Sequence, residues 1–249
     1  MNVKNKNYIN NKWVDAIDGG TFDIENPFTE QIIATAPYSK EKDVDHAVNA
    51  AKSAWGNWKT LGSLDMRDLL REVAVKSRKN DREIAEIIVA ESGKPLIECL
   101  DEIEWIASIF EYYSEIGRDQ KGRVVAPVVS RSMSMVVKEP YGVVGCIVPW
   151  NYPLLLMAWK VAPALAAGNT LVIKPSEYTP LSIMRWLEVA CDHLPNGVVN
   201  MITGDGVTGS YIVEHPLTRV IAFKGSVDTG KKIAMMAVKQ LKKTSLELG

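Results

Sequence analysis

The stretch Tyr141–Glu177 reads YGVVGCIVPWNYPLLLMAWKVAPALAAGNTLVIKPSE, and it decides the fold of the chain. An apolar, β-branched run at 143–148 is typical of a buried strand. A helix-like apolar run follows from Leu154 and ends at the stop signal Gly168, and a second buried strand spans 170–173. The stretch therefore predicts a β-α-β unit with polar residues after both strands, where open α/β sheets bind ligands.

A membrane helix is the alternative interpretation of the same apolar run. A spanning helix needs about twenty apolar residues without helix breakers. Pro149, Lys160, Pro163 and Gly168 interrupt this run. The pattern therefore favours the buried β-α-β unit.

The rest of the carboxyl-terminal half continues the alternation of strands and helices. We expect strands at 143–148, 170–173, 198–202, 220–223 and 244–248, and helices at 154–165, 181–193, 208–214 and 229–239. Short connections between alternating elements predict an α/β fold with a Rossmann-like, doubly wound parallel sheet.

The amino-terminal half begins with strand patterns and then changes to a helical period. Strands are expected at 8–14, 21–24 and 31–36, as a small antiparallel sheet at the domain edge. Apolar residues at three- and four-residue steps then predict four helices between Ser39 and Gly117. Core positions are predicted for the aromatic residues of these helices, namely Trp55, Trp58, Trp105, Phe110 and Tyr113.

A β-hairpin is predicted between these helices and the β-α-β unit. Segments 123–127 and 132–138 are strand-like, and alternation places Met133, Met135 and Val137 on one face. A hairpin cannot bury both faces against its own domain, so an exposed edge favours pairing with a partner. An ordinary edge hairpin remains the alternative.

Composition and charge bound the class of protein. With 249 residues, 47% of them hydrophobic and 24% charged, the chain suits one large domain with a small appendage. A net charge of −1 gives no reason to expect nucleic acid or an anionic membrane as a partner. The polar first ten residues lack a hydrophobic signal segment, which favours a cytoplasmic location. The three scattered cysteines show no metal-ligand spacing and are expected to be reduced and mostly buried.

Several motifs resemble the aldehyde dehydrogenase superfamily, and they cover nearly the whole chain in the order that this family shows. They are Glu91-Ser92-Gly93-Lys94-Pro95, Pro149-Trp150-Asn151-Tyr152-Pro153, Ala162–Asn169, Lys174-Pro175-Ser176-Glu177, Phe223-Lys224-Gly225-Ser226 and Leu246-Glu247-Leu248-Gly249. The resemblance implies that the parent protein oxidises an aldehyde to a carboxylic acid with NAD, or with NADP as the alternative.

The resemblance also implies a dinucleotide site along the strand ends. Its expected residues are Val148, Pro149, Trp150, Lys174, Ser176, Glu177, Gly204, Phe223, Gly225 and Ser226. The familiar Gly-x-Gly-x-x-Gly fingerprint is missing, and Gly204-Asp205-Gly206 fits it only in part. Lys224 stands where family members often have Thr.

Two interpretations of Lys174 and Glu177 are open. By themselves they are a solvated pair at a strand end. By resemblance they contact the adenine ribose, and a carboxylate at Glu177 would repel a 2′-phosphate, which favours NAD over NADP.

Two catalytic residues follow from the resemblance. By its position alone, Asn151 would be a helix cap. By resemblance it corresponds to an amide donor of the oxyanion hole, a task that suits an amide because its N–H donates to negative charge without ionising. Glu247, otherwise a surface carboxylate, corresponds to the general base that activates water. Tyr152 and Trp159 are candidates for an aromatic substrate entrance, and core packing is the alternative for Trp159. The sequences Pro149–Pro153 and Trp159-Lys160 are similar to those of family members that act on betaine aldehyde, other amino aldehydes or semialdehydes.

The family's nucleophilic cysteine lies beyond the Glu-Leu-Gly motif, and we expect no cysteine of this chain to replace it. The expected organisation is a discontinuous NAD-binding domain (1–122 and 140–249), an oligomerisation hairpin (123–139) and a catalytic domain beyond this chain. The chain alone is therefore expected to be inactive, and a homo-oligomer joined through that hairpin is expected. The alternatives are a truncated homologue that binds NAD or aids assembly, and an unrelated Rossmann-like dehydrogenase.

Overall fold

The computed structural model describes residues 3–127 and 129–249. Met1, Asn2 and Val128 lie outside the described residues, and so does any expectation for the polar terminus or the hairpin that falls on them. The core is a seven-stranded sheet in the order β11-β10-β7-β8-β9-β1-β2. The strands are β1 (Asn7–Ile9), β2 (Lys12–Val14), β7 (Val143–Ile147), β8 (Thr170–Lys174), β9 (Val199–Met201), β10 (Thr218–Gly225) and β11 (Lys243–Leu248).

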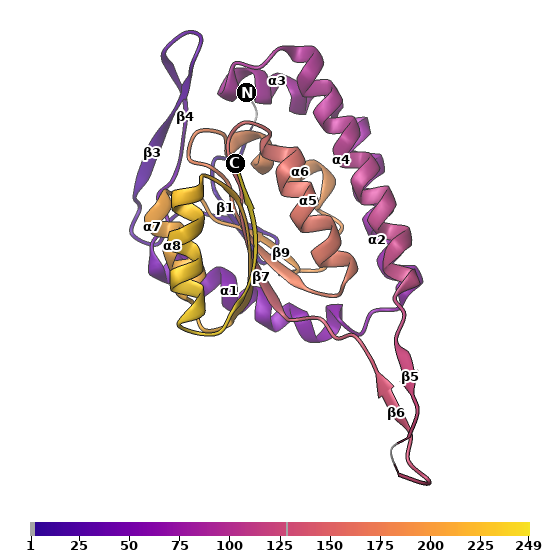
Figure 1. Cartoon of the computed structure of the whole chain (residues 1–249). Coiled ribbons are helices and arrows are strands. Elements are labelled where there is room, and N and C mark those ends of the chain that lie inside the picture. The colour runs from indigo at the N-terminus through magenta and orange to yellow at the C-terminus, as the bar shows by residue number, and fades with distance from the viewer. Residues whose placement is uncertain (1–2, 128) are drawn as a thin grey trace.

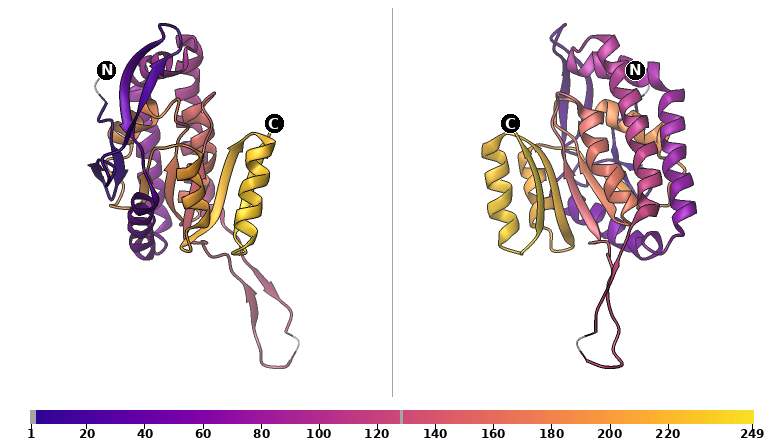
Figure 2. Two further views of the ribbon diagram at one scale, coloured as in Figure 1. Left: turned by 90° about the vertical axis from the view of Figure 1, so that its left-hand side faces the viewer. Right: turned by 45° about the vertical axis from the view of Figure 1, so that its right-hand side comes forward.

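Helices cover both faces of this sheet (Figures 1 and 2). They are α1 (Glu41–Trp58), α2 (Ser63–Lys79), α3 (Asp81–Ser92), α4 (Leu96–Ile116), α5 (Pro153–Ala166), α6 (Leu181–Ala190), α7 (Gly206–Glu214) and α8 (Val227–Val238), with a 3₁₀ turn at Gly117–Asp119. Strands β7 to β11 pair in parallel. The expected doubly wound α/β fold is therefore confirmed.

Alternating side chains of the parallel strands enter two separate hydrophobic clusters. Val144 and Cys146 of β7 belong to the larger cluster, which the helices α2 to α6 share. Val143 and Ile147 of the same strand belong to the smaller cluster with α1, α7 and α8. Strand geometry sends successive side chains to opposite faces, so a strand that is apolar throughout must be covered on both.

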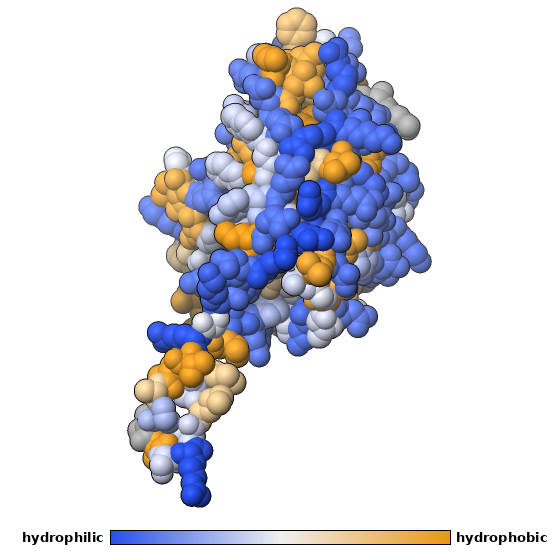
Figure 3. Space-filling view, turned by 90° about the vertical axis from the view of Figure 1, so that its right-hand side faces the viewer, coloured by the Kyte–Doolittle hydropathy of each residue, from blue (hydrophilic) through white to orange (hydrophobic). Residues whose placement is uncertain are grey.

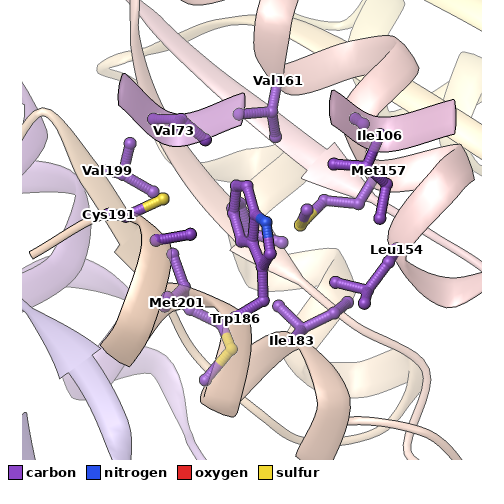
Figure 4. Packing of buried hydrophobic residues seen from close by; sticks show 14 of the residues in the cluster. Val73, Ile106, Leu154, Met157, Val161, Ile183, Trp186, Cys191, Val199 and Met201 are labelled. Carbon is purple, nitrogen blue, oxygen red and sulfur yellow. The ribbon is translucent and has the colours of Figure 1, made fainter. Parts of the chain in front are cut away.

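Trp186 of α6 anchors the larger cluster. Its ring lies among apolar side chains from α2, α4, α5 and the sheet strand β9 (Figure 4). Its indole Nε1–H donates to Ser77 Oγ at 2.9 Å, so the ring is buried without losing its hydrogen bond.

The amino-terminal strands differ from the expectation. Segment 8–14 is not one strand, because Asn10 and Asn11 adopt positive φ angles (52° and 57°) and form a turn between β1 and β2. These two strands extend the central sheet, since β1 pairs antiparallel with β9. Strands β3 (Thr21–Asn26) and β4 (Gln31–Pro37) form a separate two-stranded ribbon.

The expected aromatic core is right in part. Trp58 and Phe110 are buried, and Trp55 and Tyr113 are half-buried. Trp105 is 51% exposed on α4, so its predicted core position is wrong. It falls on the outer face of a helix whose inner face already carries Ile103, Ile106 and Phe110.

The predicted hairpin protrudes from the globular body as β5 (Arg123–Val125) and β6 (Ser134–Val136), which pair antiparallel. Its apolar residues are exposed, including Val124 (75%), Met133 (77%) and Met135 (61%). The space-filling view shows hydrophobic residues gathered on this arm (Figure 3). Among the described residues, none of the helices combines the length and the apolar character that a membrane span requires.

Candidate functional site

The predicted site residues follow strands whose carboxyl ends lie at one edge of the sheet. Ile147 at the end of β7 stands opposite Lys174 of β8 on one side and Phe223 of β10 on the other. Lys224 stands opposite Glu247 of β11. The order of connection reverses around β7, which has β8 on one side and β10 on the other. In open α/β sheets, such a switch point opens the crevice that receives ligands.

The turn after β7 carries Asn151 at the surface. Val148 is buried (3% exposed), Pro149 is half-buried and Trp150 is 56% exposed. The turn ends where α5 begins, with Pro153 in the first helical position. Asn151 is exposed to solvent, whereas Val148 packs into the core.

Lys174 is a buried cation at the end of β8. Its side chain is 5% exposed, and its Nζ lies 3.5 Å from Glu177 Oε2. Burial lowers the pKa of Lys174, and the neighbouring carboxylates of Glu177 and Asp205 oppose that shift. Ser176 is buried beside this pair, so the short segment after β8 is firmly held.

The turn from β10 to α8 is built for close backbone approach. A side chain at Gly225 would place its Cβ 2.6 Å from the ring of Phe223, so the position excludes larger residues unless that ring moves. Ser226 caps α8, and its Oγ accepts from the Thr229 amide at 3.3 Å. The first backbone N–H groups of α8 thus meet a neutral hydroxyl, and they favour an anion nearby.

Glu247 forms an ion pair that the sequence did not predict. Its Oε1 lies 2.6 Å from Nζ of Lys160, whose side chain is 3% exposed. Lys160 comes from α5 and Glu247 from β11, so the pair links the helix after Asn151 to the last strand. Glu247 itself is 38% exposed in its side chain and remains accessible to solvent.

A hollow of about 700 Å³ opens between α7 and α8 at this edge. Ile147 and Lys174 lie at its floor, and its walls include Val207, Ile233 and Met236. Among the predicted cofactor residues, only Lys174 lines this hollow. The others lie along the same edge of the sheet, outside its lining.

Asp205 is the acidic residue among those that line the hollow, and the sequence analysis did not predict it as a site residue. It caps α7. Gly204 before it has a φ of +145°, a conformation that is strained for any residue with a side chain. The available signal was the Gly204-Asp205-Gly206 triplet before a helical pattern, since Asp is a common N-cap. Within residues 3–127 and 129–249, no three His, Cys, Asp or Glu side chains are placed to hold a metal ion.

A parallel sheet with a switch point and an apolar hollow at its carboxyl edge defines an α/β protein of the doubly wound class, which binds ligands at the strand ends. The sequence model of the aldehyde dehydrogenase family matches residues 13–249, and the chain belongs to that family. The predicted family membership is thereby confirmed.

Curated relatives agree with this assignment. Betaine aldehyde dehydrogenase of Bacillus subtilis is 37% identical over 97% of this chain, and betaine aldehyde dehydrogenase 1 of Oryza sativa is 39% identical over 97%. D-glyceraldehyde dehydrogenase (NADP⁺) of Thermoplasma acidophilum is 38% identical over 98%. The chain spans about half the length of these relatives, 50% in each case.

Solved structures confirm the fold. Betaine aldehyde dehydrogenase of Staphylococcus aureus in complex with NAD⁺ superposes with a TM-score of 0.96 at 33% identity. The match covers 100% of this chain and 50% of that one. An NADP-dependent enzyme of Escherichia coli superposes equally well, with a TM-score of 0.96 at 33% identity, and 52% of that chain is covered.

Proposed function

We propose that this chain is the cofactor-binding part of an NAD-linked aldehyde dehydrogenase, whose parent protein oxidises an aldehyde to a carboxylic acid. The observation that carries the proposal is the hollow between α7 and α8, with apolar walls and the buried Lys174 at its floor. An apolar hollow with a few convergent polar groups suits a nucleoside. Solved relatives hold NAD⁺ on the same fold.

Each end of the dinucleotide has residues that fit it. The adenine would lie between α7 and α8, and Lys174 and Glu177 would hydrogen-bond its ribose. Gly225 and Ser226 at the start of α8 would admit the phosphates, since Gly permits close approach and the helix N-terminus favours anions. A bound nicotinamide supplies the hydride acceptor of the reaction.

The catalytic proposals concern Asn151 and Glu247. Asn151 donates its amide N–H to the oxygen on which negative charge develops, at a surface that the turn after β7 leaves exposed. Glu247 accepts a proton from water. Its Oε1 is bound to Lys160, so Oε2 is the oxygen left for that task.

The nucleophile is proposed to lie outside this chain. Cys99, Cys146 and Cys191 are all buried, and burial raises the pKa of Cys99 to about 11 and of Cys146 to about 12. A buried thiol with a raised pKa does not supply a thiolate at neutral pH.

The substrate class is proposed from the relatives and from two aromatic residues. The two aromatic residues expected at the substrate entrance are Tyr152, which is half-buried next to Asn151, and Trp159, which is 49% exposed on α5. Aromatic faces attract a cationic headgroup, and two relatives are betaine aldehyde dehydrogenases. We infer a betaine aldehyde, another amino aldehyde or a semialdehyde as substrate of the parent protein.

An assembly module without catalysis is the second candidate function. The apolar, exposed hairpin around β5 and β6 favours it, because an exposed apolar edge invites a partner. Through this hairpin, residues 123–139, we propose a homo-oligomer for the parent protein as well.

Calorimetric titration of the purified chain with NAD tests the first proposal. We expect saturable binding, and Lys174→Met should weaken it by roughly tenfold, because the ribose loses a donor in a buried place. Lys79→Met, at an exposed lysine on α2 outside the residues proposed to bind NAD, serves as the matched control and should leave the affinity unchanged. Failure of the unaltered, folded chain to bind NAD would refute the proposal and leave the assembly module as the better reading.

A further inference from the structure

Asp205 lies in the hollow as a carboxylate fixed from three sides. Its Oδ2 accepts from Tyr38 Oη–H at 2.7 Å. Its Oδ1 accepts from the backbone N–H of Val207 at 2.8 Å and of Thr208 at 3.4 Å. The carboxylate is therefore held in one place where the hollow meets the end of β8.

Asp205 stays ionised in this position. Burial alone would raise its pKa, but the hydrogen bonds from Tyr38 and Val207 lower it below its ordinary value. Its field also acts on Lys174, whose pKa it raises against the effect of burial. Two carboxylates therefore act on the ammonium of Lys174: Asp205, which lines the hollow, and Glu177, which lies outside its lining.

The two helices that border the hollow differ in charge at their N-termini. The N-cap of α7 is the carboxylate of Asp205, whereas the N-cap of α8 is the neutral hydroxyl of Ser226, and the carboxylate in the first turn of α8, Asp228, is exposed to solvent. An anion is therefore favoured at α8 and repelled at α7. Lys232 and Lys239 also line the hollow, but they lie further along α8, away from the strand ends.

We propose that Asp205 is a second specificity-determining residue, which acts beside Glu177 to exclude a 2′-phosphate on the adenine ribose. This inference rests on the proposed function, because it requires the adenosine half of a dinucleotide in the hollow. By repulsion, Asp205 also leaves α8 as the end where the phosphates bind.

Asparagine at position 205 separates charge from shape. Asn caps helices as well as Asp does, and its Oδ1 still accepts from the Val207 amide, while its Nδ2 donates to Tyr38 Oη in place of the bond that Tyr38 donates to Asp205. Asp205→Asn should therefore keep the fold and remove the charge, with the direction of the Tyr38 hydrogen bond reversed. Asp205→Ser, another good neutral cap, is the second variant if the first fails to fold. Tyr38→Phe is the matched control, since it removes a hydrogen bond and leaves the carboxylate.

The experiment compares the Kd of NAD with the Kd of NADP by calorimetric titration. For the unaltered chain we expect tighter binding of NAD. Asp205→Asn should lower the ratio of the NADP Kd to the NAD Kd by about fivefold, as expected for one removed charge near a phosphate. The change should come chiefly from stronger NADP binding. Glu177→Gln should act in the same direction, and Tyr38→Phe should leave the ratio within about twofold.

The outcomes separate this inference from the proposed function. If the Asp205→Asn chain binds NAD normally and keeps the ratio of the NADP Kd to the NAD Kd of the unaltered chain, the inference about Asp205 is overturned and the proposed function stands. An equal change in Tyr38→Phe would assign the effect to geometry and also overturn it. Absence of NAD binding by the unaltered chain overturns both.

Discussion

Glu102 joins three parts of the molecule that meet beneath the turn of Asn151. Its side chain is fully buried, and Oε2 lies 2.6 Å from Lys94 Nζ. Oε1 accepts from the amides of Leu154 and Leu155 at 2.9 and 3.0 Å, so it caps α5 from outside the helix. Lys94 in turn lies 3.6 Å from the centroid of the Tyr152 ring. The placement of the Asn151 turn thus depends on a glutamate of α4.

Glu102→Ala should lower the free energy of unfolding by about 3 kcal/mol or more, because it removes the ion-pair partner of the half-buried Lys94 and the acceptor of two buried helix amides. Urea denaturation measures the change. Glu104→Ala is the control, because Glu104 is exposed in its ion pair with Arg78, and the expected loss is below about 1 kcal/mol. Similar losses in both variants would contradict the role given to Glu102.

Glu91 makes stability depend on pH. It is 2% exposed and accepts from the amides of Leu181 and Ser182 at the start of α6. Burial raises its pKa from 4.5 to about 8, although those hydrogen bonds pull the other way. Between these two values the folded chain holds a proton that the unfolded chain releases. The stabilisation is therefore complete at low pH and is lost as the pH rises through about 8.

We expect the free energy of unfolding to fall between about pH 5 and pH 8, by at most about 1.4 kcal/mol per pH unit from this group. Glu91→Gln should flatten that slope, since glutamine does not titrate. Urea denaturation at a series of pH values gives the slope for both chains. A variant with the same slope as the unaltered chain would show that Glu91 is ionised in the folded state.

At the scale of elements, the parallel part of the sheet could be predicted because its signals are local. Each strand from β7 to β11 is followed or preceded by a helical pattern within a few residues, and Gly93 and Gly168 end their helices with φ angles of 74° and 81°. The place of β1 could not be predicted in this way. It depends on pairing with β9, a contact that Asn10 and Asn200 secure across 190 residues.

The candidate site was likewise predictable only where its signals are local in the sequence. Motifs place Asn151, Lys174, Gly225 and Glu247 at strand ends, and the structure brings those ends to one edge. The hollow itself was not predictable, because the gap between α7 and α8 depends on how both helices pack on the sheet. The Lys160 and Glu247 pair joins elements 87 residues apart and leaves no local pattern.

The hairpin of β5 and β6 is the proposed contact between subunits, because its apolar side chains are exposed. Val124→Asp, at a side chain that is 75% exposed, should turn a self-associated chain into a monomer, because a charge opposes burial in an apolar interface. Light scattering after size exclusion, over a range of concentrations, measures the assembly. Val75→Asp on α2 (60% exposed) is the matched control and should leave the assembly unchanged. Persistence of the same oligomer in Val124→Asp would move the contact elsewhere.

At the scale of the whole molecule, the proposed function separates cofactor binding from nucleophilic chemistry. The described chain has a hollow at its surface, in which we propose the adenosine half of the dinucleotide binds, but its three thiols lie in the interior. Cys99 and Cys191 lie within the larger cluster together with Cys146, so no movement of a single side chain would expose them at the strand ends. The chain should therefore bind a dinucleotide without oxidising an aldehyde.

Thiol labelling and NADH absorbance test this separation together. The folded chain should react slowly with a thiol reagent at neutral pH and rapidly in urea, because burial keeps each sulfur protonated and out of reach. With NAD and a panel of aldehydes it should form no NADH beyond the background. Fast labelling of one cysteine, suppressed by NAD and accompanied by steady NADH formation, would place a working nucleophile within this chain. Cys146→Ala would then identify whether the thiol of β7, the strand that leads to Asn151, is that nucleophile.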